Sequence, residues 1–236
     1  MKVVIISDIH ANFAALSALP ESYDEIWVLG DLVNYGPRPA EVVDWVRAHT
    51  DVVVCGNHDH AVGSACDPLA SPRFREMAHA TQRVSEFLLT PPQKHYLKTL
   101  PIRTELRREE TLFYLCHAVP SGPLYTYCPA DSNRWAKECR KIRADILLVG
   151  HTHIPSIRCV GKCTVVNPGS LGQPKTGSPE ACYAVWENGD IELKTYAYPV
   201  EQTVSDIRRL ALPPGIRDDL IHVLRKGQAP ARGDAK

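Results

Sequence analysis

The feature that most constrains the fold is a set of short, β-branched runs, each of which ends in a polar side chain. Residues 2–7, 25–29 and 51–55 are apolar and rich in valine and isoleucine, so we predict three buried strands. Helical spacing follows the first two runs, over 12–19 and 39–48. Strands that alternate with helices in this way predict an α/β layered fold.

The middle and the last third of the chain carry different patterns. Residues 61–99 have no strong strand pattern, and we predict a helical insertion that covers one edge of the sheet. Further strands are expected over 102–105, 111–116, 145–149, 157–160, 163–167, 181–187 and 190–197, and further helices over 132–142, 203–211 and 215–226. We therefore expect a single domain over 1–227, followed by a small, polar, disordered tail over 228–236.

Charge and hydropathy exclude several classes of protein. Lys+Arg and Asp+Glu both number 27, so a formal net charge of +0 gives no reason to expect bulk binding of nucleic acid or of an anionic membrane. The apolar part of the N-terminus covers only residues 3–6, which is too short for the core of a signal peptide or for a membrane span. We expect a cytoplasmic protein with no membrane partner.

Polar side chains recur at the carboxyl ends of five predicted strands. They are Asp8 and His10, then Asp31, then Asn57 and His58, then His117, and finally His151 and His153. Each alone is commoner as a helix cap, a turn residue or a packed histidine, so the recurrence carries the signal. Because open α/β sheets place their sites at this edge, we expect these side chains to lie close together.

The stretch VVVCGNHDHA, at 52–61, shows the pattern most clearly. We expect Gly56 to let the chain turn sharply after the strand and to begin a rigidly held loop. Asn57 and His58 would project from that loop at the sheet edge, whereas His60 is expected to be only a loop residue.

The chemistry of these side chains points to divalent metals. Carboxylates, imidazoles and one carboxamide, with no thiolate among them, suit Mn²⁺, Fe²⁺, Zn²⁺, Co²⁺ or Ni²⁺. The eight positions are too many for one ion. They suit two ions that share a bridging carboxylate and lie about 3.5–4 Å apart.

The ordered series S-D-I-H, G-D-L-V, G-N-H-D, a lone histidine and G-H-T-H resembles the signature of the calcineurin-like metallophosphoesterase superfamily. The likeness is greatest to its small bacterial and archaeal members, mostly phosphodiesterases or phosphatases, and it covers roughly residues 1–200. GDLVNYGPRP and NPGSLGQP also resemble that subgroup. The resemblance implies a four-layer αββα sandwich, with two mixed sheets flanked by helices and a di-metal site at one sheet edge.

The resemblance also implies a role for each polar residue. Asp8, His10 and His153 would hold one metal, Asn57, His117 and His151 would hold the other, and Asp31 would bridge both. His58 would face the substrate phosphate without binding metal, and Asp59 would orient His58. One departure is visible, because Ala11 and Ala118 stand where family members often carry glycine.

The implied function is hydrolysis of phosphate esters by a hydroxide that bridges two divalent ions, with manganese favoured. His58 and Asp31 would be the catalytic residues, and His58 would assist the leaving oxygen. We favour a phosphodiesterase that acts on a phosphorylated small molecule or a nucleotide. A phosphomonoesterase, a protein phosphatase or a dinucleoside-polyphosphate hydrolase is the alternative, and a catalytically inactive protein-binding scaffold is a remote one.

Other residues near the motifs are candidates for substrate contact. Asn34, Tyr35 and Arg38 follow Asp31 on one loop, and Arg38 could pair with a phosphate through its guanidinium fork. Tyr125 and Tyr127 could stack on a base or simply pack. The Gly-rich stretch NPGSLGQPK either cradles phosphate or forms a structural turn beside G-H-T-H. Homo-oligomers remain possible, and the sequence leaves the assembly open.

Overall fold

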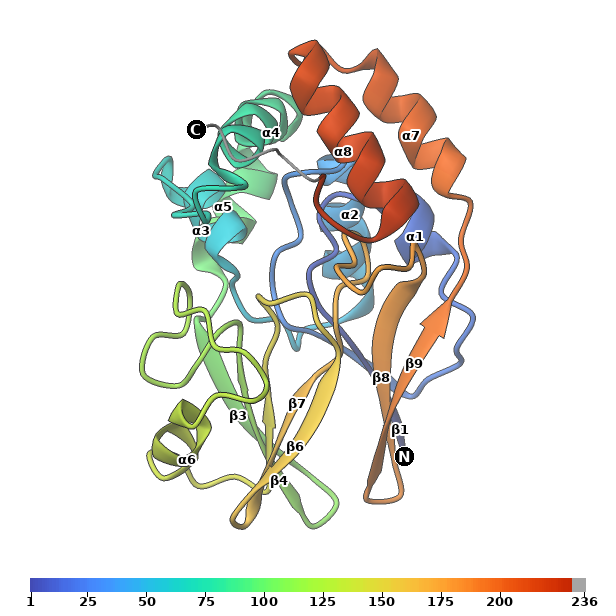
Figure 1. Cartoon of the computed structure of the whole chain (residues 1–236). Coiled ribbons are helices and arrows are strands. Elements are labelled where there is room, and N and C mark those ends of the chain that lie inside the picture. The colour runs from blue at the N-terminus through green and yellow to red at the C-terminus, as the bar shows by residue number, and fades with distance from the viewer. Residues whose placement is uncertain (231–236) are drawn as a thin grey trace.

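The computed structural model describes residues 1–230 and contains two β-sheets that pack face to face between layers of helix (Figure 1). The first sheet has the order β2-β1-β8-β9 and contains β1 (Lys2–Ile6), β2 (Glu25–Val28), β8 (Ala181–Glu187) and β9 (Asp190–Tyr196). In this sheet β1 runs parallel to β2 and antiparallel to β8, so the sheet is mixed. A strand from the start of the chain therefore lies beside one from its last quarter.

The second sheet has the order β3-β4-β5-β7-β6. Its strands are β3 (Arg103–Arg108), β4 (Thr111–Cys116), β5 (Ile146–Leu148), β6 (Ser156–Val160) and β7 (Cys163–Asn167). The three central strands β4, β5 and β7 run parallel, and the edge strands β3 and β6 pair antiparallel to their neighbours. This sheet is also mixed, and its parallel strands end at one edge.

Successive side chains of a strand point to opposite faces of the sheet, and this alternation explains the layers. In β1, Val3 and Ile5 point into the core between the two sheets, while Val4 and Ile6 pack under α1 (Phe13–Ser17) and α2 (Pro39–His49). The rings of Trp27 and Phe113 join the sheets edge to face, with centroids 4.9 Å apart. The outer face of the second sheet is covered by α6 (Arg134–Cys139). The predicted four-layer αββα sandwich is confirmed.

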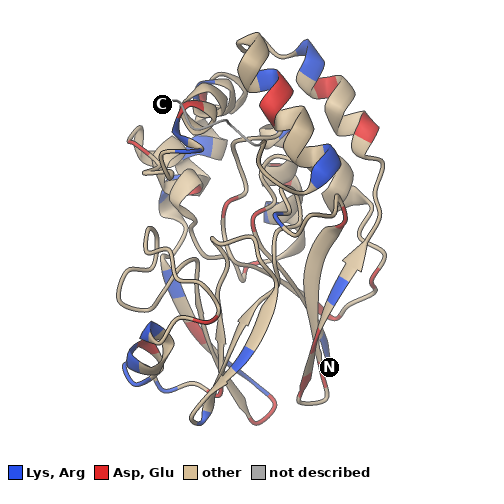
Figure 2. Ribbon diagram, viewed as in Figure 1, with Lys and Arg blue, Asp and Glu red and all other residues tan. Residues whose placement is uncertain are grey.

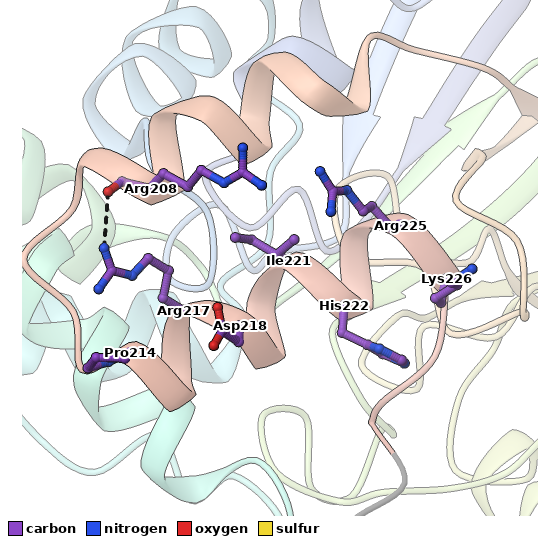
Figure 3. A pocket seen from close by; sticks show the side chains of 8 residues that line it. All are labelled: Arg208, Pro214, Arg217, Asp218, Ile221, His222, Arg225 and Lys226. Atoms are coloured by element: carbon purple, nitrogen blue, oxygen red, sulfur yellow. Dashed lines mark hydrogen bonds between the residues drawn. The ribbon is translucent and has the colours of Figure 1, made fainter.

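The remaining helices gather at the end of the sandwich where the parallel strands stop (Figure 1). They are α3 (Asn57–Ser64), α4 (Arg75–Leu88), α5 (Pro91–Thr99), α7 (Val200–Arg209) and α8 (Pro214–Lys226). Helices α4, α7 and α8 share one apolar cluster. A groove of about 540 Å³ lies along α7 and α8, lined by Arg208, Arg217 and Arg225 among others, and the Arg217 guanidinium donates to the Arg208 carbonyl (Figure 3).

The predicted strand over 51–55 is wrong. Only Val53 forms a bridge, to Val28 in parallel. The amide of Val54 still donates to the carbonyl of Val28, but the amide of Cys55 donates to the carbonyl of Pro101 outside the sheet. The chain leaves the sheet because α5 and its following turn supply that competing acceptor. The loop predicted after it is also wrong, because Asn57 begins α3 and His60 lies within that helix.

Most other boundaries shift by a few residues, as fraying ends commonly do. The first strand of the predicted hairpin extends to Arg108, the helix over 132–142 is shorter, and the helix expected from 203 begins at Val200. Of the predicted tail, 231–236 lie outside the described residues, while the carbonyls of Ala229 and Pro230 accept hydrogen bonds from Arg73. The single-domain organisation stays a prediction.

Charges of both signs occur on the same helices and strands (Figure 2). Within residues 1–230, no helix is both long and apolar enough to cross a bilayer.

Glu21 provides a test of how the first sheet is held to its flanking loop. Its half-buried carboxylate pairs with the ammonium groups of Lys2 and Lys194 and accepts a hydrogen bond from the hydroxyl of Tyr183. These hydrogen bonds, that of Lys2 above all, lower the pKa of Glu21 to about 2 from an ordinary 4.5. Because the pKa is depressed in the folded state, the stabilisation is present above pH 4.5 and is lost as pH falls towards 2.

We expect Glu21→Gln to lower the free energy of unfolding by about 1 kcal/mol at pH 7 and to have little effect near pH 2. Urea unfolding across this pH range measures the difference. Glu110→Gln, in the exposed β3–β4 turn, is the control and should leave the curve unchanged. A Glu21→Gln effect that is the same at every pH would contradict the assignment.

Candidate metal centre

Two groups of metal-ligating side chains lie at the edge where the parallel strands end. Asp8, His10 and His153 form the first group, and Asp31, His117 and His151 form the second. In each group the ligand atoms all lie within 4.8 Å of one another. These residues follow β1, β2, β4 and β5, so both sheets contribute to one site. All of them are buried except His151, which is partly exposed.

The first group presents lone pairs that face each other. Nδ1 of His10 lies 3.0 Å from the carbonyl oxygen of Val33, and Nδ1 of His153 lies 2.7 Å from that of Gln173. A carbonyl only accepts, so each Nδ1 carries the proton and each Nε2 keeps a lone pair. The two Nε2 atoms are 3.2 Å apart, and Asp8 Oδ1 is 3.2 Å from that of His153. Such an arrangement is stable only around a cation.

The second group repeats this chemistry. Nδ1 of His117 donates to the carbonyl of Leu29 at 2.7 Å, so its Nε2 turns towards Asp31 Oδ2 at 3.2 Å. The same oxygen of Asp31 lies 3.8 Å from Nε2 of His10 in the first group. Asp31 therefore stands between the two groups, which is the position that a bridging carboxylate needs.

Orphaned polar atoms show that the residues fit a metal pair. Asp8 Oδ1, Asn57 Oδ1 and His117 Nε2 are buried and make no hydrogen bond. The amide nitrogen of Asn57 donates to the carbonyl of Pro68 at 2.7 Å, which leaves its oxygen as the free ligand atom. Buried groups of this kind are costly unless something pairs with them. The donor set of oxygen and imidazole nitrogen is the one that divalent metals of this type take.

The electrostatics lead to the same conclusion. Burial, together with the charge of Asp31, raises the pKa of Asp8 to about 6. Burial alone would keep His117 neutral, but the carboxylates of Asp31 and Asp8 outweigh it and raise its pKa to about 10. Burial lowers the pKa of His10 to about 3, so that imidazole is neutral and able to ligate. Two buried carboxylates thus require nearby positive charge, which a proton or a metal can supply.

The backbone at the ligands is strained. Asp8, His10, Asp31, His151 and His153 all have φ between 47° and 66°, in the left-handed region that side chains rarely adopt. Ala11, next to His10, is at φ 50°. Backbone bonds hold these turns together, since the amide of His10 donates to the carbonyl of Asp31 at 2.9 Å. Strained backbone of this kind persists only where the surrounding structure holds it in place, and it is found mostly at functional sites.

Asp59 holds the bridging residue in place. Its buried carboxylate accepts the amides of Asp31 at 2.7 Å, Leu32 at 2.8 Å and Gly56 at 3.0 Å. Both oxygens of Asp59 are used in this way, so the role expected for it beside His58 falls to another residue. The amide nitrogen of Asn34 lies 2.8 Å from Nδ1 of His58.

His58 and the neighbouring residues form a cavity of about 330 Å³ over the metal-ligating groups. His58 lies in the first turn of α3, and its backbone amide donates to Asp31 Oδ1 at 2.9 Å. Tyr35 lines the cavity with its ring 4.8 Å from those of His10 and His58. Arg38 does not line it, because its guanidinium pairs with Asp206 of α7 at 2.7 Å.

Several cavity residues were not singled out from the sequence. They are Leu69, Ala70, Ser71, Phe74 and Lys175. Lys175 ends the stretch NPGSLGQPK, which was considered as a phosphate cradle, so that stretch contained a usable signal. The others lie between α3 and α4, where no motif marks them. Tyr127 also lines the cavity, with its ring centroid 6.1 Å from that of His151, and its side chain is 60% exposed.

A sandwich of two mixed sheets with paired groups of metal ligands at one edge is the architecture of a metal-dependent phosphoesterase, a hydrolase of phosphate esters. Residues 1–190 match the model of the calcineurin-like phosphoesterase superfamily domain, and the chain belongs to that superfamily. Its members use a binuclear divalent metal centre, and this chain carries two groups of residues that could hold one.

Individual relatives agree with the family. Phosphodiesterase YfcE of Escherichia coli strain K12 is 29% identical over 203 residues, which cover 80% of this chain and 88% of the relative. A symmetrical bis(5'-nucleosyl)-tetraphosphatase of Methylobacillus flagellatus is 30% identical over 127 residues, or 50% of this chain and 43% of that relative. The crystal structure of a metallophosphoesterase from Sphaerobacter thermophilus superposes with a TM-score of 0.79 at 29% identity, covering 93% of this chain and 98% of that one.

Gly56 allows a close approach that the second group requires. A Cβ added there would collide with the carboxylate and the amide nitrogen of Asp31. We expect Gly56→Ala to displace Asp31, to weaken Mn²⁺ binding by at least about tenfold and to lower the free energy of unfolding by about 1–3 kcal/mol. Titration calorimetry and urea unfolding measure the two effects.

Gly215→Ala in α8 is the matched control, because a Cβ there meets nothing within 4 Å. We expect the control to bind Mn²⁺ as the parent does. Parent-like Mn²⁺ affinity in Gly56→Ala would contradict the role given to this contact.

Proposed function

We propose that the protein is a phosphodiesterase whose two metals are held by Asp8, His10 and His153 and by Asn57, His117 and His151, with Asp31 shared between them. The observation that carries the proposal is the position of Asp31 Oδ2, within 3.8 Å of Nε2 of both His10 and His117 and beside the cavity that His58 lines. Manganese is favoured among the divalent ions that suit oxygen and imidazole ligands.

When bound, the metal pair would supply a water of lowered pKa and would neutralise charge on the phosphoryl oxygens. The chain's own residues supply the orientation. The shared carboxylate of Asp31 is fixed by the amide of His58 on Oδ1, and its backbone is fixed by Asp59. A site held from both sides loses little free energy to reorganisation when charge develops on the substrate.

His58 is the candidate hydrogen-bond donor to the leaving oxygen. An amide NH₂ such as that of Asn34 can only donate, so Nδ1 of His58 accepts and Nε2 carries the proton. Burial lowers the pKa of His58 to about 4, so the imidazole is neutral near pH 7 and offers a neutral N–H. A neutral N–H hydrogen-bonded to the leaving oxygen can stabilise the negative charge that grows there.

The same geometry would serve the alternative reactions. Phosphomonoester or dinucleoside-polyphosphate hydrolysis needs no different ligands, and the likeness to a tetraphosphatase over 50% of this chain favours the nucleotide alternative. The exposed ring of Tyr127 at the cavity supports a substrate with a planar end group. A non-catalytic scaffold is disfavoured, because every predicted ligand position holds a residue able to ligate.

The first test is steady-state hydrolysis of bis(p-nitrophenyl) phosphate and of p-nitrophenyl phosphate by metal-stripped protein resupplied with Mn²⁺. We expect turnover that requires Mn²⁺, is faster with the diester and falls by about 10²–10⁴-fold in His58→Ala. His95→Ala, in exposed α5, is the control and should keep full activity. Absence of turnover of either ester with metal bound would argue for a scaffold.

A second test asks whether Asn34 positions the imidazole of His58. Asn34 touches His58 and is not expected to touch the reacting atoms, so it is a positioning residue. We expect Asn34→Ala to lower kcat by about tenfold, with KM and Mn²⁺ affinity near those of the parent. Asn34→Asp offers Nδ1 only an acceptor, so Nε2 keeps its proton only while His58 is an imidazolium, and we expect kcat to fall as the pH rises through the raised pKa of that imidazole. Parent-like kcat in Asn34→Ala would rule out the positioning role.

A further inference from the structure

We propose that Lys175 forms an anion subsite beside the metal groups, which binds a phosphate oxygen beyond the two that a simple diester offers. The inference rests on the proposed phosphate-ester hydrolysis and narrows its substrate class. It adds a specificity-determining residue that belongs to neither ligand group.

The position of Lys175 places its charge in the cavity. It lines the cavity together with Asp31, His58, His151 and His153. Asp8 and Asp31 act on its ammonium through their charge, and Lys175 in turn opposes protonation of His153. A phosphate held at the metal-ligating groups would therefore lie within the field of this cation.

Lys175 has no protein anion to pair with. Within residues 1–230 the carboxylates reach it only through their longer-range charge, and none makes an ion pair with its ammonium. The ring of Phe74 is its close partner among residues 1–230, with the ring centroid 4.6 Å from Nζ. A cation on an aromatic face keeps its charge while leaving other directions of the ammonium open. A half-buried cation without an anion is costly, and an anionic ligand would remove that cost.

The residues that line the cavity around Lys175 indicate which class of ligand would supply the anion. A diester phosphorus carries two non-bridging oxygens and one negative charge, which the metal groups can take. The extra oxygen would come from a monoester phosphate, as a third oxygen on the same phosphorus, or from a neighbouring phosphate in a chain. The exposed side chains of Leu69 and Tyr127 and the ring of Phe74 give the cavity an apolar and aromatic wall, which suits a planar group attached to that phosphate.

The test compares three esters in Mn²⁺-supplied protein: bis(p-nitrophenyl) phosphate, p-nitrophenyl phosphate and diadenosine tetraphosphate. We expect Lys175→Met to lower kcat/KM by about 10–100-fold for at least one of the last two, and by less than about threefold for the simple diester. Loss on the monoester alone would identify a third oxygen, and loss on the tetraphosphate alone would identify a neighbouring phosphate. Lys175→Arg should recover most of the lost kcat/KM.

A binding measurement makes the test independent of turnover. Titration calorimetry with inorganic phosphate should show a Kd about tenfold higher in Lys175→Met than in the parent. Lys162→Met, in the exposed turn between β6 and β7, is the matched control and should bind phosphate as the parent does.

The outcomes separate this inference from the proposed function. Equal losses on all three esters, no loss on any, or phosphate binding that is absent or unchanged by Lys175→Met would overturn the subsite. If the parent hydrolyses none of the esters but its phosphate binding weakens in Lys175→Met, the subsite stands and the proposed hydrolysis fails.

Discussion

The structure depends on positive charge at one buried edge. Asp8 and Asp31 are fully buried carboxylates, and three imidazoles donate hydrogen bonds from Nδ1 to backbone carbonyls and turn their Nε2 atoms towards those carboxylates, where a proton on His117 or a metal can meet the negative charge. The Nδ1 protons of these histidines are already hydrogen-bonded to the carbonyls of Val33, Leu29 and Gln173. Moving a proton from Nδ1 to Nε2 would leave that carbonyl without its donor. The backbone therefore specifies the tautomer of these three imidazoles, while the buried carboxylates create the need for a cation. Hydrogen bonds formed during folding thus preorganise the site.

Both sheets and α3 contribute to that edge. The strands β1 and β2 of one sheet and β4 and β5 of the other stop at it, and α3 begins there with Asn57 and His58 in its first turn. Asp59 connects these parts, since it caps α3 and at the same time binds the amides that follow β2. The strained turns at the ligands persist because they are tied from several directions. Rigidity at the metal groups contrasts with the more exposed aromatic wall formed by the segment before α4 and by Tyr127.

The sequence predicted those parts of the structure that local pattern determines. β-branched runs predicted most of the strands, and the polar residues after them predicted the candidate ligands that the fold brings together, because parallel strands deliver their ends to one edge. The errors came from contacts between distant residues. Residues 51–55 have a strand-like composition, yet the amide of Cys55 finds its acceptor in Pro101. Arg38 follows the site in sequence, yet Asp206 of α7 takes its guanidinium. Asn34 was expected at the substrate and instead meets His58, and nothing local distinguishes these partners.

The pairing of β1 with β8 has a consequence for the order in which the molecule is made. During synthesis β1 and Asp8 are made first. The strand β8, which pairs with β1 at the centre of that sheet, begins only at Ala181. By then His151 and His153 have already been made. Until then the nascent chain exposes one unpaired edge of β1, whose residues after Lys2 are all apolar. Most of the polypeptide must be synthesised before either candidate ligand group is complete. All of the candidate ligands are therefore synthesised before β8, while the sheet that supports them is still open at one edge of β1.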